Sequence, residues 1–360
     1  MRRMPRFSAP ALLALASFAT LACSQPVAPD PSAQARDAPP PAATRGLDPG
    51  RMRAAVQRAR GLPRLRALIV ARDGATLAEH RFAGPALDTP VNIKSASKSV
   101  LSALAGIAIG RGVLTGVDQK IAPVLRADLP ANGDPRLADI DVEDLLTMRA
   151  GLGRTSGPNY GAWVASPNWV RYALARPFDD DPGGRMLYST GSSHLMSAVL
   201  TRASGRSTYD LATEWLARPL GIAIPQWPRD GQGVYFGGND MLMSPRALLR
   251  FGEMYRGDGV IGGRRVLPAG WVAQSWTPRT MSPYNGHGYG YGWFAKTVGG
   301  HDVRFAWGYG GQMLFVVPDL ALSVVMISDP SPQERGDHLD RLHALLDGAI
   351  IPAAERGAAG

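Results

Sequence analysis

The sequence contains very few cysteines and lysines. Its 360 residues include one cysteine, Cys23, and four lysines against 35 arginines. A single cysteine excludes an intramolecular disulfide framework. The shortage of lysine is informative because lysine, unlike arginine, can lose its proton when it is buried and can then act as a base. The few lysines are therefore candidates for positions at which arginine cannot serve.

Several common catalytic and binding motifs are also absent from the sequence. No Gly-x-Ser-x-Gly pentapeptide occurs, which argues against the nucleophile elbow of α/β-hydrolases. There is no phosphate-binding Gly-x-x-x-x-Gly-Lys loop, and we expect no cofactor. The histidines have no metal-ligand spacing such as His-Glu-x-x-His, so we expect no metal site, and His194 is interpreted as a core residue. The arginines are scattered and not clustered, so we expect no nucleic-acid binding.

The first 22 residues have the composition of an export signal. Three arginines precede an apolar stretch, Ala9 to Ala22, that is too short to span a bilayer. Cys23 follows directly and favours lipid attachment, although Thr20 occupies a position that is usually aliphatic in bacterial lipoprotein signals. Cleavage to a soluble secreted form is the alternative. We expect an exported protein on the periplasmic face of a bacterial cell envelope, held at the membrane only by a lipid anchor.

The rest of the chain is predicted to form one α+β domain. Residues 23–46 are a Pro/Ala-rich tether, residues 47–350 the domain, and residues 351–360 a flexible tail. Strands are predicted at 65–72 and 75–82, joined by Asp73-Gly74, and again at 289–296, 301–307, 313–317 and 321–327. The middle of the chain is mainly helical. This order predicts an antiparallel sheet flanked by helices, with an inserted helical lobe at about 136–230 and a cleft at the lobe boundary.

Two of the four lysines flank one serine, in the segment Lys94-Ser95-Ala96-Ser97-Lys98. The following residues, up to Arg111, are apolar and small, and Gly112 marks the end of a buried helix. Ser95 and Lys98 would then lie on one helix face, about 5–6 Å apart at Cβ. This is the geometry of a Ser-Lys nucleophile pair. The alternative is that Ser95 caps a core helix and Lys98 reaches solvent.

Two later segments accompany the Ser-x-x-Lys motif. Tyr188-Ser189-Thr190 lies on a turn before a helix, and the glycine-rich segment 308–312 is predicted to lie on a late strand. In this order, the motifs resemble those of the serine β-lactamase and penicillin-recognising family. The similarity is greatest to its class C-like branch, which includes esterases and 6-aminohexanoate-oligomer hydrolases. Segments 139–147, 218–222 and 237–245 extend the resemblance over most of residues 60–350.

The resemblance implies a role for each matching residue. Ser95 would form an acyl-enzyme, Lys98 would accept its proton, and Tyr188, with a phenol acidified by Lys94 or Lys98, would protonate the leaving group. The oxyanion hole would combine the backbone N–H of Ser95 with one from the third motif, Gly311 being preferred to its neighbour Gly310. Four further residues are expected to contact the small-molecule substrate: Tyr160, Asn239, Tyr309 and Gln312. For Tyr160 and the tryptophans near it, packing between the lobes is the alternative.

The chain departs from the family pattern at two places. Thr190 replaces the asparagine that usually ends the second motif, and the third motif begins with Gly308 where the family usually has a cation. Arg304 is a candidate replacement for that cation. Because the missing cation helps to hold the carboxylate of β-lactams and D-Ala-D-Ala peptides, we expect esters or linear amides as substrates. The alternatives are a penicillin-interacting enzyme (a β-lactamase or a D-Ala-D-Ala carboxypeptidase) and a non-catalytic envelope binding protein.

Overall fold

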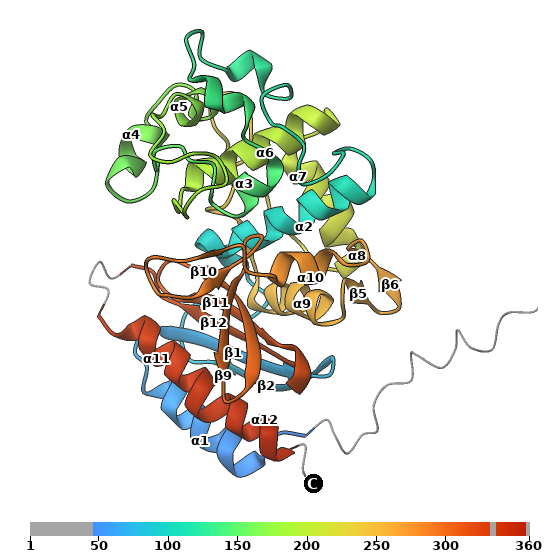
Figure 1. Ribbon diagram of the computed structural model, residues 1–360. Coiled ribbons are helices and arrows are strands. Elements are labelled where there is room, and N and C mark those ends of the chain that lie inside the picture. Colours follow the sequence, from blue (N-terminus) through green and yellow to red (C-terminus); the bar gives the residue numbers. More distant parts are fainter. Residues whose placement is uncertain (1–45, 332–335, 358–360) are drawn as a thin grey trace, which may run out of the picture. The chain divides into compact units, whose positions relative to one another are not determined.

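The structure is a computed structural model that describes residues 46–331 and 336–357 (Figure 1). The predicted export signal, Cys23 and the predicted tether up to residue 45 lie outside the described residues. Among the helices of the described ranges, none has the length and apolar character needed to cross a membrane.

The described domain is built on an eight-stranded sheet in the order β2-β1-β12-β11-β10-β9-β8-β7. Its strands are β1 (Leu65–Arg72), β2 (Ala75–Arg81), β7 (Thr280–Met281), β8 (Gly288–Tyr289), β9 (Phe294–Val298), β10 (His301–Gly308), β11 (Gln312–Val317) and β12 (Leu322–Ser328). All pairs are antiparallel, and β1 pairs with β12, which joins the two ends of the domain. The predicted antiparallel sheet is confirmed. Asp73 and Gly74 form the first hairpin turn, with φ values of 49° and 78°.

Helices cover both faces of the sheet (Figure 1). Along β1, Leu68 and Val70 face a core shared with α1 (Pro49–Arg60) and α11 (His338–Leu345). Ile69, on the opposite face, packs in a core shared with α2 (Ser97–Gly110) and α9 (Pro245–Arg256). This alternation is the two-residue period of a strand that is buried on both sides.

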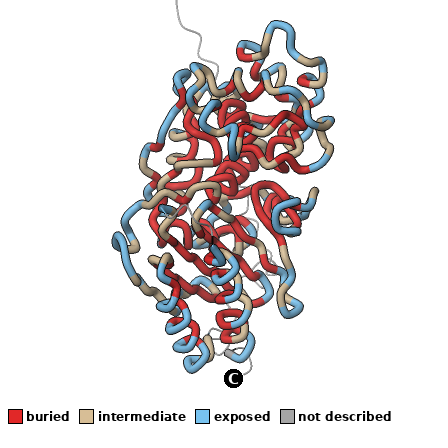
Figure 2. Tube along the Cα trace, turned by 90° about the vertical axis from the view of Figure 1, so that its left-hand side faces the viewer, coloured by how far each residue is buried: buried red, intermediate tan, exposed pale blue. Residues whose placement is uncertain are grey.

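The remaining elements form the helical lobe and its connections. The helices of this region are α3 (Val142–Leu146), α4 (Tyr160–Val164), α5 (Trp169–Leu174), α6 (Thr190–Ser204), α7 (Thr208–Leu211) and α8 (Arg218–Leu220). Two short antiparallel pairs, β3 (Val91–Asn92) with β4 (Leu242–Met243) and β5 (Val260–Ile261) with β6 (Arg264–Arg265), lie outside the main sheet. Figure 2 shows that buried chain runs through both the sheet region and the helical lobe.

The predicted flexible tail is wrong for most of its length. Residues Ile351–Gly357 form helix α12, which follows α11 after a π-helical turn, η9 (Leu346–Ile350). Ile351, Ala353 and Ala354 are buried and α12 contacts α1. Burial of these apolar side chains against α1 explains why the chain stays helical beyond residue 350.

Helix α2 carries Lys98, the last residue of the Ser-x-x-Lys motif, and is buried along almost its whole length. A 3-10 turn, η3 (Lys94–Ala96), leads into it. Gly106 lies against the ring of Trp271 in α10 (Trp271–Trp276), where a Cβ atom at position 106 would be only 2.3 Å from a ring carbon. The absence of a side chain at this position therefore lets α2 dock directly on an aromatic plane.

Candidate active site

Ser95 and Lys98 meet as the sequence predicts. The Lys98 Nζ lies 3.0 Å from Ser95 Oγ, donates to the Gly238 carbonyl at 2.7 Å and is 3.5 Å from Thr190 Oγ1. Lys98 is only 3% exposed, so its amine does not reach solvent. The alternative interpretation, a capped core helix with a solvent-exposed lysine, is excluded.

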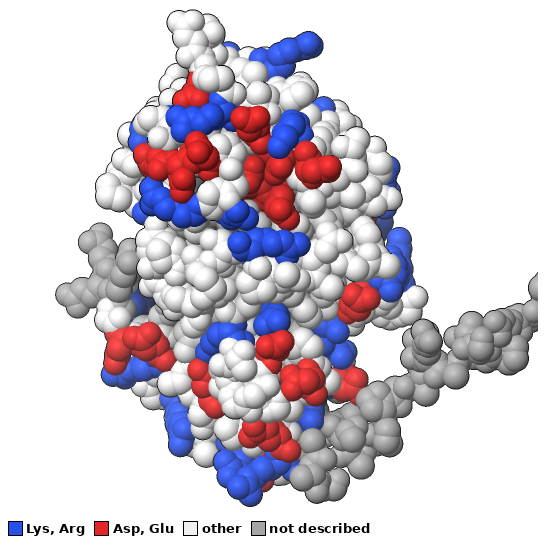
Figure 3. Space-filling model, viewed as in Figure 1, with Lys and Arg blue, Asp and Glu red and all other residues white. Residues whose placement is uncertain are grey.

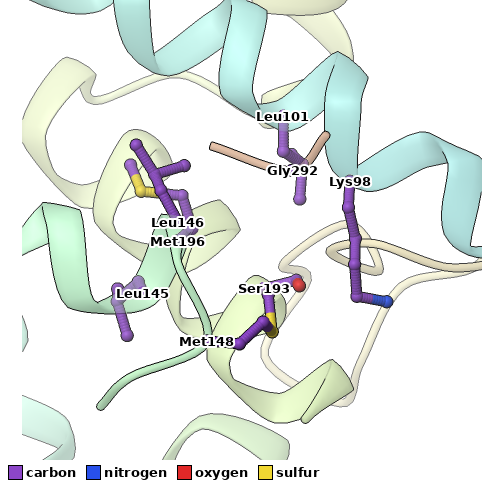
Figure 4. A pocket seen from close by; sticks show the side chains of 8 residues that line it. All are labelled: Lys98, Leu101, Leu145, Leu146, Met148, Ser193, Met196 and Gly292. Atoms are coloured by element: carbon purple, nitrogen blue, oxygen red, sulfur yellow. The ribbon is translucent and has the colours of Figure 1, made fainter. Parts of the chain in front are cut away.

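Burial lowers the pKa of Lys98 from 10.5 to about 7. Figure 4 shows the Lys98 stem beside Ser193, with its nitrogen turned away from the other labelled side chains; the cavity that these residues line has a volume of about 10 Å³. The other lining residues are largely apolar: Leu101, Leu145, Leu146, Met148, Met196 and Gly292. Removal from water disfavours the charged form of the buried amine, so a substantial fraction of Lys98 is neutral at pH 7.

Tyr188 completes a three-residue group with Ser95 and Lys98. The Lys98 Nζ lies 4.9 Å from the centroid of the Tyr188 ring. Burial raises the pKa of Tyr188 to about 12, and a hydrogen bond with Ser95 opposes this effect. The expected acidified phenol is therefore wrong, because desolvation of the phenolate outweighs the hydrogen bond with Ser95. The phenol is protonated at neutral pH.

A loop from the helical lobe holds the second motif in place. The Thr190 N–H donates to Ser156 Oγ at 2.9 Å, and the Gly191 N–H donates to Thr155 Oγ1 at 2.7 Å. The backbone N–H of Thr155 in turn donates to Ser189 Oγ at 3.1 Å. These bonds satisfy the first N–H groups of α6, which lack a cap from the preceding residue. Sequence reasoning missed Thr155 and Ser156, because their partners lie more than 30 residues away.

Lys94 has a structural partner and does not reach the phenol. Its Nζ forms an ion pair with Asp240 Oδ1 at 3.1 Å, and the same oxygen accepts from Asn92 Nδ2 at 2.6 Å. The Lys94 N–H donates to Asn92 Oδ1 at 2.8 Å. Both Lys94 and Asp240 have positive φ values, 52° and 55°, which are uncommon for residues other than glycine. The ion pair therefore joins the turn that contains the nucleophile to the loop of residues 237–240, each through a residue with positive φ.

The loop around residues 237–240 approaches the catalytic lysine closely. Gly238 has a φ of 74°, and a Cβ at this position would lie 2.8 Å from Lys98 Cγ and 2.6 Å from Ser193 Cβ. Only glycine allows the Gly238 carbonyl to reach the amine in this conformation. The next residue, Asn239, donates from Nδ2 to the Tyr160 hydroxyl at 2.9 Å, which brings together two residues predicted to contact substrate.

The aromatic residues near Tyr160 pack within the helical lobe. Trp163 is fully buried and contacts the rings of Tyr160, Trp169 and Phe236. This supports packing for Trp163, while Tyr160 keeps partial exposure beside Asn239.

His194 is a satisfied core residue, as the sequence predicts. It is fully buried, its Nε2 lies 3.0 Å from Asp230 Oδ2, and the Gly237 N–H donates to its Nδ1 at 3.3 Å. An Nδ1 that accepts a hydrogen bond leaves the proton on Nε2, so a neutral imidazole donates to the Asp230 carboxylate. The pKa of Asp230 is held below its ordinary value, because the bonds from His194 and the loop backbone outweigh the effect of burial. Asp230 was not predicted.

The third motif is a strand end followed by a turn, and not a continuous strand. Strand β10 ends at Gly308, residues 309–311 form the turn, and β11 begins at Gln312. A Cβ at Gly308 would lie 2.2 Å from the Ile93 carbonyl and 3.0 Å from Lys94 Cβ. Gly308 is therefore the residue of this motif that packs directly against the turn that contains the nucleophile. The next residue, Tyr309, is 45% exposed.

Three predicted members of this motif point away from the nucleophile. The Gly311 N–H donates to the Gly308 carbonyl at 3.1 Å, and Gly311 packs near Leu342 of α11, so its predicted oxyanion role is wrong. Gly310 lies against Pro330. Gln312 is buried and its Nε2 donates to the Ser328 carbonyl at 2.8 Å, so it is not a substrate contact. Gly308, Gly310 and Gly311 cannot be told apart in the sequence, so the sequence did not indicate which of them approaches the nucleophile.

Arg304 does not replace the missing cation of the third motif. It precedes Gly308 by four residues, roughly 13 Å along a strand. Its Nη2 pairs with Asp302 Oδ2 at 3.0 Å.

In the described ranges, no group of three or more histidine, cysteine, aspartate or glutamate side chains is placed to hold a metal ion. The face shown in Figure 3 carries its charged side chains mainly over the helical lobe and the base of the sheet, with a largely uncharged band between.

Comparison with known proteins agrees with this geometry. A model of the beta-lactamase family matches residues 66–348, so the chain belongs to this family, and it is a serine hydrolase in that general sense. Among solved structures, EstCE1, a hydrolase with promiscuous acyltransferase activity, is 18% identical, with a TM-score of 0.68 over 83% of this chain and 98% of that chain. A penicillin-binding protein homologue from Caulobacter crescentus is 18% identical, with a TM-score of 0.65 over 87% and 99% of the two chains.

A third similar structure is named as a 6-aminohexanoate-dimer hydrolase from Bacillus anthracis. It is 16% identical, with a TM-score of 0.65, and the match covers 81% of this chain and 79% of that chain. At these identities the three structures establish the fold, which is the β-lactamase and penicillin-binding-protein fold that the sequence predicts.

Proposed function

We propose that the protein hydrolyses an ester or linear amide bond through an acyl-enzyme on Ser95. The observation that carries this proposal is the buried Lys98 amine, 3.0 Å from the Ser95 hydroxyl and with a pKa lowered to about 7. A neutral amine donates through its hydrogens and accepts through one lone pair. The Gly238 carbonyl can only accept, so the Lys98 amine donates one of its N–H groups to it. The lone pair of the amine therefore stays free to accept the Ser95 proton.

Acylation begins when Ser95 Oγ attacks the substrate carbonyl carbon. The hydroxyl proton passes to Lys98 Nζ, and the carbonyl electrons move to oxygen to form an oxyanion. The backbone N–H of Ser95 and that of Tyr309 would stabilise this charge, because Gly308 lies directly on the nucleophile turn and Tyr309 is the next residue. Tyr309 thus replaces Gly311 in the proposed oxyanion hole.

The intermediate collapses when the bond to the leaving group breaks. Tyr188, protonated at neutral pH, would give its proton to the departing oxygen or nitrogen and would regain one from the Lys98 ammonium. A water molecule would then attack the acyl carbon and lose a proton to Lys98, directly or through Tyr188. The bond between Ser95 Oγ and the acyl carbon breaks and Oγ takes that proton back, so all three residues return to their starting state.

The substrate is proposed to be an ester or linear amide and not a β-lactam. The third motif lacks the usual cation, and Arg304 is bound to Asp302 instead. Tyr160 and Asn239, joined by a hydrogen bond and only partly buried, would contact the substrate together with the exposed Tyr309. A penicillin-interacting enzyme and a non-catalytic binding protein are the competing outcomes of the test below.

The test is turnover of p-nitrophenyl acetate by the wild-type protein and by Ser95→Ala. The proposal expects turnover by the wild type and its loss in the variant, with an unchanged unfolding midpoint. Ser204→Ala, which removes a hydroxyl bonded to the Leu200 carbonyl on α6, is the matched control and should keep full activity. A Ser95→Ala variant that keeps its rate would refute the mechanism. Nitrocefin hydrolysis, or a penicilloyl adduct on Ser95, would select the penicillin-interacting alternative.

A second part of the proposal concerns location. We propose export and lipid attachment at Cys23, on the basis of the N-terminal sequence alone. Metabolic labelling with radioactive palmitate should mark the wild-type chain and leave Cys23→Ala unlabelled. Labelling that survives the substitution would exclude this anchor.

A further inference from the structure

The loop that carries the Gly238 carbonyl is anchored on one histidine. The Lys98 amine donates to that carbonyl at 2.7 Å. One residue earlier, the Gly237 N–H donates to His194 Nδ1 at 3.3 Å. Within the described ranges, these are the two hydrogen bonds that the backbone of Gly237 and Gly238 makes. The position of the carbonyl that contacts the amine therefore depends on the His194 ring.

The two glycines lie between helices α6 and α2. A Cβ at Gly237 would lie 2.2 Å from the Ser193 carbonyl oxygen and 2.6 Å from His194 Cα, and a Cβ at Gly238 would lie 2.8 Å from Lys98 Cγ. Because glycine adopts more backbone conformations than any other residue, close packing alone does not fix the direction of the carbonyl. The bond to the imidazole supplies that restraint.

This bond requires one tautomer of the imidazole. Nδ1 can accept only if the proton is on Nε2, and the partner of Nε2 decides which tautomer is present. Asp230 Oδ2 lies 3.0 Å from Nε2, and a carboxylate can only accept. The His194 and Asp230 side chains have no solvent exposure, and the rings of Trp163, Trp169 and Phe236 contact the imidazole. Solvent therefore cannot take the place of the carboxylate.

We propose that Asp230 and His194 are positioning residues for Lys98. The carboxylate selects the Nε2–H tautomer, and the free Nδ1 lone pair holds Gly237 so that the next carbonyl meets the amine. These roles rest on the proposed function, because the Gly238 carbonyl matters only if the Lys98 amine must keep its lone pair towards Ser95. Neither residue is proposed to touch the reacting atoms.

Asp230→Asn changes the tautomer while it keeps the size of the side chain. Asp230 Oδ1 accepts from the N–H groups of Gln232 and Val234, both at 2.9 Å. An amide should keep its oxygen there and turn its NH₂ group towards Nε2, which must then accept. The imidazole proton moves to Nδ1 and faces the Gly237 N–H, donor against donor. The bond to Gly237 is the longest of the four at 3.3 Å, so we expect it to break.

Two measurements follow this variant. Imidazole ¹⁵N spectra, with His194 assigned by its substitution, should show the proton on Nε2 in the wild type and on Nδ1 in Asp230→Asn. The kcat/KM on p-nitrophenyl acetate should fall by about 10- to 100-fold, the cost of a displacement of about 1 Å at a reacting group. Asp128→Asn is the matched control, a buried carboxylate of the same lobe that pairs with Arg202, and it should leave both readouts unchanged.

Two substitutions of His194 separate positioning from packing. His194→Asn places an amide near the position of Nδ1, where it can accept from the Gly237 N–H, but it is too short to reach Asp230. His194→Gln places its amide near the position of Nε2, where it can donate to Asp230, but it offers no acceptor to Gly237. We therefore expect His194→Asn to have the higher kcat/KM, by about 10-fold or more, and His194→Gln the higher unfolding midpoint in urea. A purely structural role would give both properties the same order.

Three results would overturn these positioning roles while the proposed function stands. They are an Asp230→Asn variant with the wild-type kcat/KM, a wild-type imidazole with its proton on Nδ1, and a His194→Gln variant at least as active as His194→Asn. If Asp230→Asn does not fold, the wild-type spectrum and the two His194 variants decide. Absence of turnover in the wild type, or turnover that survives Ser95→Ala, refutes the proposed function, and the positioning roles fall with it.

Discussion

The substitution Lys98→Met replaces a buried amine by an apolar side chain of similar length. In the folded protein, burial lowers the pKa of Lys98 from 10.5 to about 7, which corresponds to about 5 kcal/mol of unfavourable free energy at pH values below about 7, where both the folded and the unfolded state hold the proton. Methionine carries no such penalty. It does forfeit the hydrogen bonds to Ser95 and the Gly238 carbonyl, each of about 0.5–1.5 kcal/mol. The variant should therefore be more stable than the wild type at pH 7.

The sign of the pH dependence follows from proton binding. Below about pH 7, the amine is protonated in both the folded and the unfolded state. Between about pH 7 and 10.5, only the unfolded state binds the proton, so the free energy of unfolding of the wild type rises with pH by about 1.4 kcal/mol per pH unit. The stability advantage of Lys98→Met should shrink by about 2–3 kcal/mol between about pH 7 and pH 9.

Urea unfolding of both proteins at several pH values measures this difference. The wild-type kcat/KM on p-nitrophenyl acetate should rise over the same range, with a midpoint near pH 7, because the neutral amine is the base. Lys98→Met should have almost no activity at any pH. A stability difference that stays constant from about pH 7 to pH 9 would refute the reasoning, since it would mean that the pKa of the folded-state amine is close to that of the unfolded chain.

Three further substitutions test the surroundings of the amine. Tyr188→Phe should lower kcat by about 10²- to 10⁴-fold, with a larger loss on an anilide than on a p-nitrophenyl ester, because only the amine leaving group needs the proton. Gly238→Ala should reduce both activity and unfolding free energy, since its Cβ would lie 2.8 Å from Lys98 Cγ. Gly233→Ala is the control: Gly233 has a φ of 82° and nothing within 4 Å of an added Cβ, so this variant measures the effect of backbone strain alone. His194→Ala should lower the urea-unfolding free energy by about 1–3 kcal/mol, because the buried Oδ2 of Asp230 loses its donor while Oδ1 keeps its two backbone donors. A loss below about 1 kcal/mol would contradict that role.

The parts of the fold that sequence reasoning predicts are those with a local signal. Asp73-Gly74 indicated a hairpin because few other residues adopt positive φ at both turn positions, and the structure has this turn. Asp141 caps α3 and Ser244 caps α9 through bonds to residues three positions away. The pairing of Ser95 with Lys98 is equally local, because both lie within one turn.

The rest of the site depends on contacts that no local pattern encodes. The second motif is held by Ser156, which is 34 positions away, and His194 is bonded to Asp230, which is 36 positions away. The third motif contains three glycines of similar appearance, and only the approach of the nucleophile turn to Gly308 distinguishes them. The direction of the Tyr188 pKa was mistaken because it depends on the balance between burial and charge, which requires coordinates.

The contact between Gly106 and Trp271 has a consequence for how this enzyme tolerates mutation. Any side chain added at position 106 must push α2 away from the indole ring, and Ser95 lies in the 3-10 turn that leads directly into this helix. A displacement of about 1 Å at a reacting atom can cost about 100-fold in rate. Random mutagenesis should therefore recover substitutions at Gly106 as correctly expressed but slow variants, three helical turns away from the chemistry.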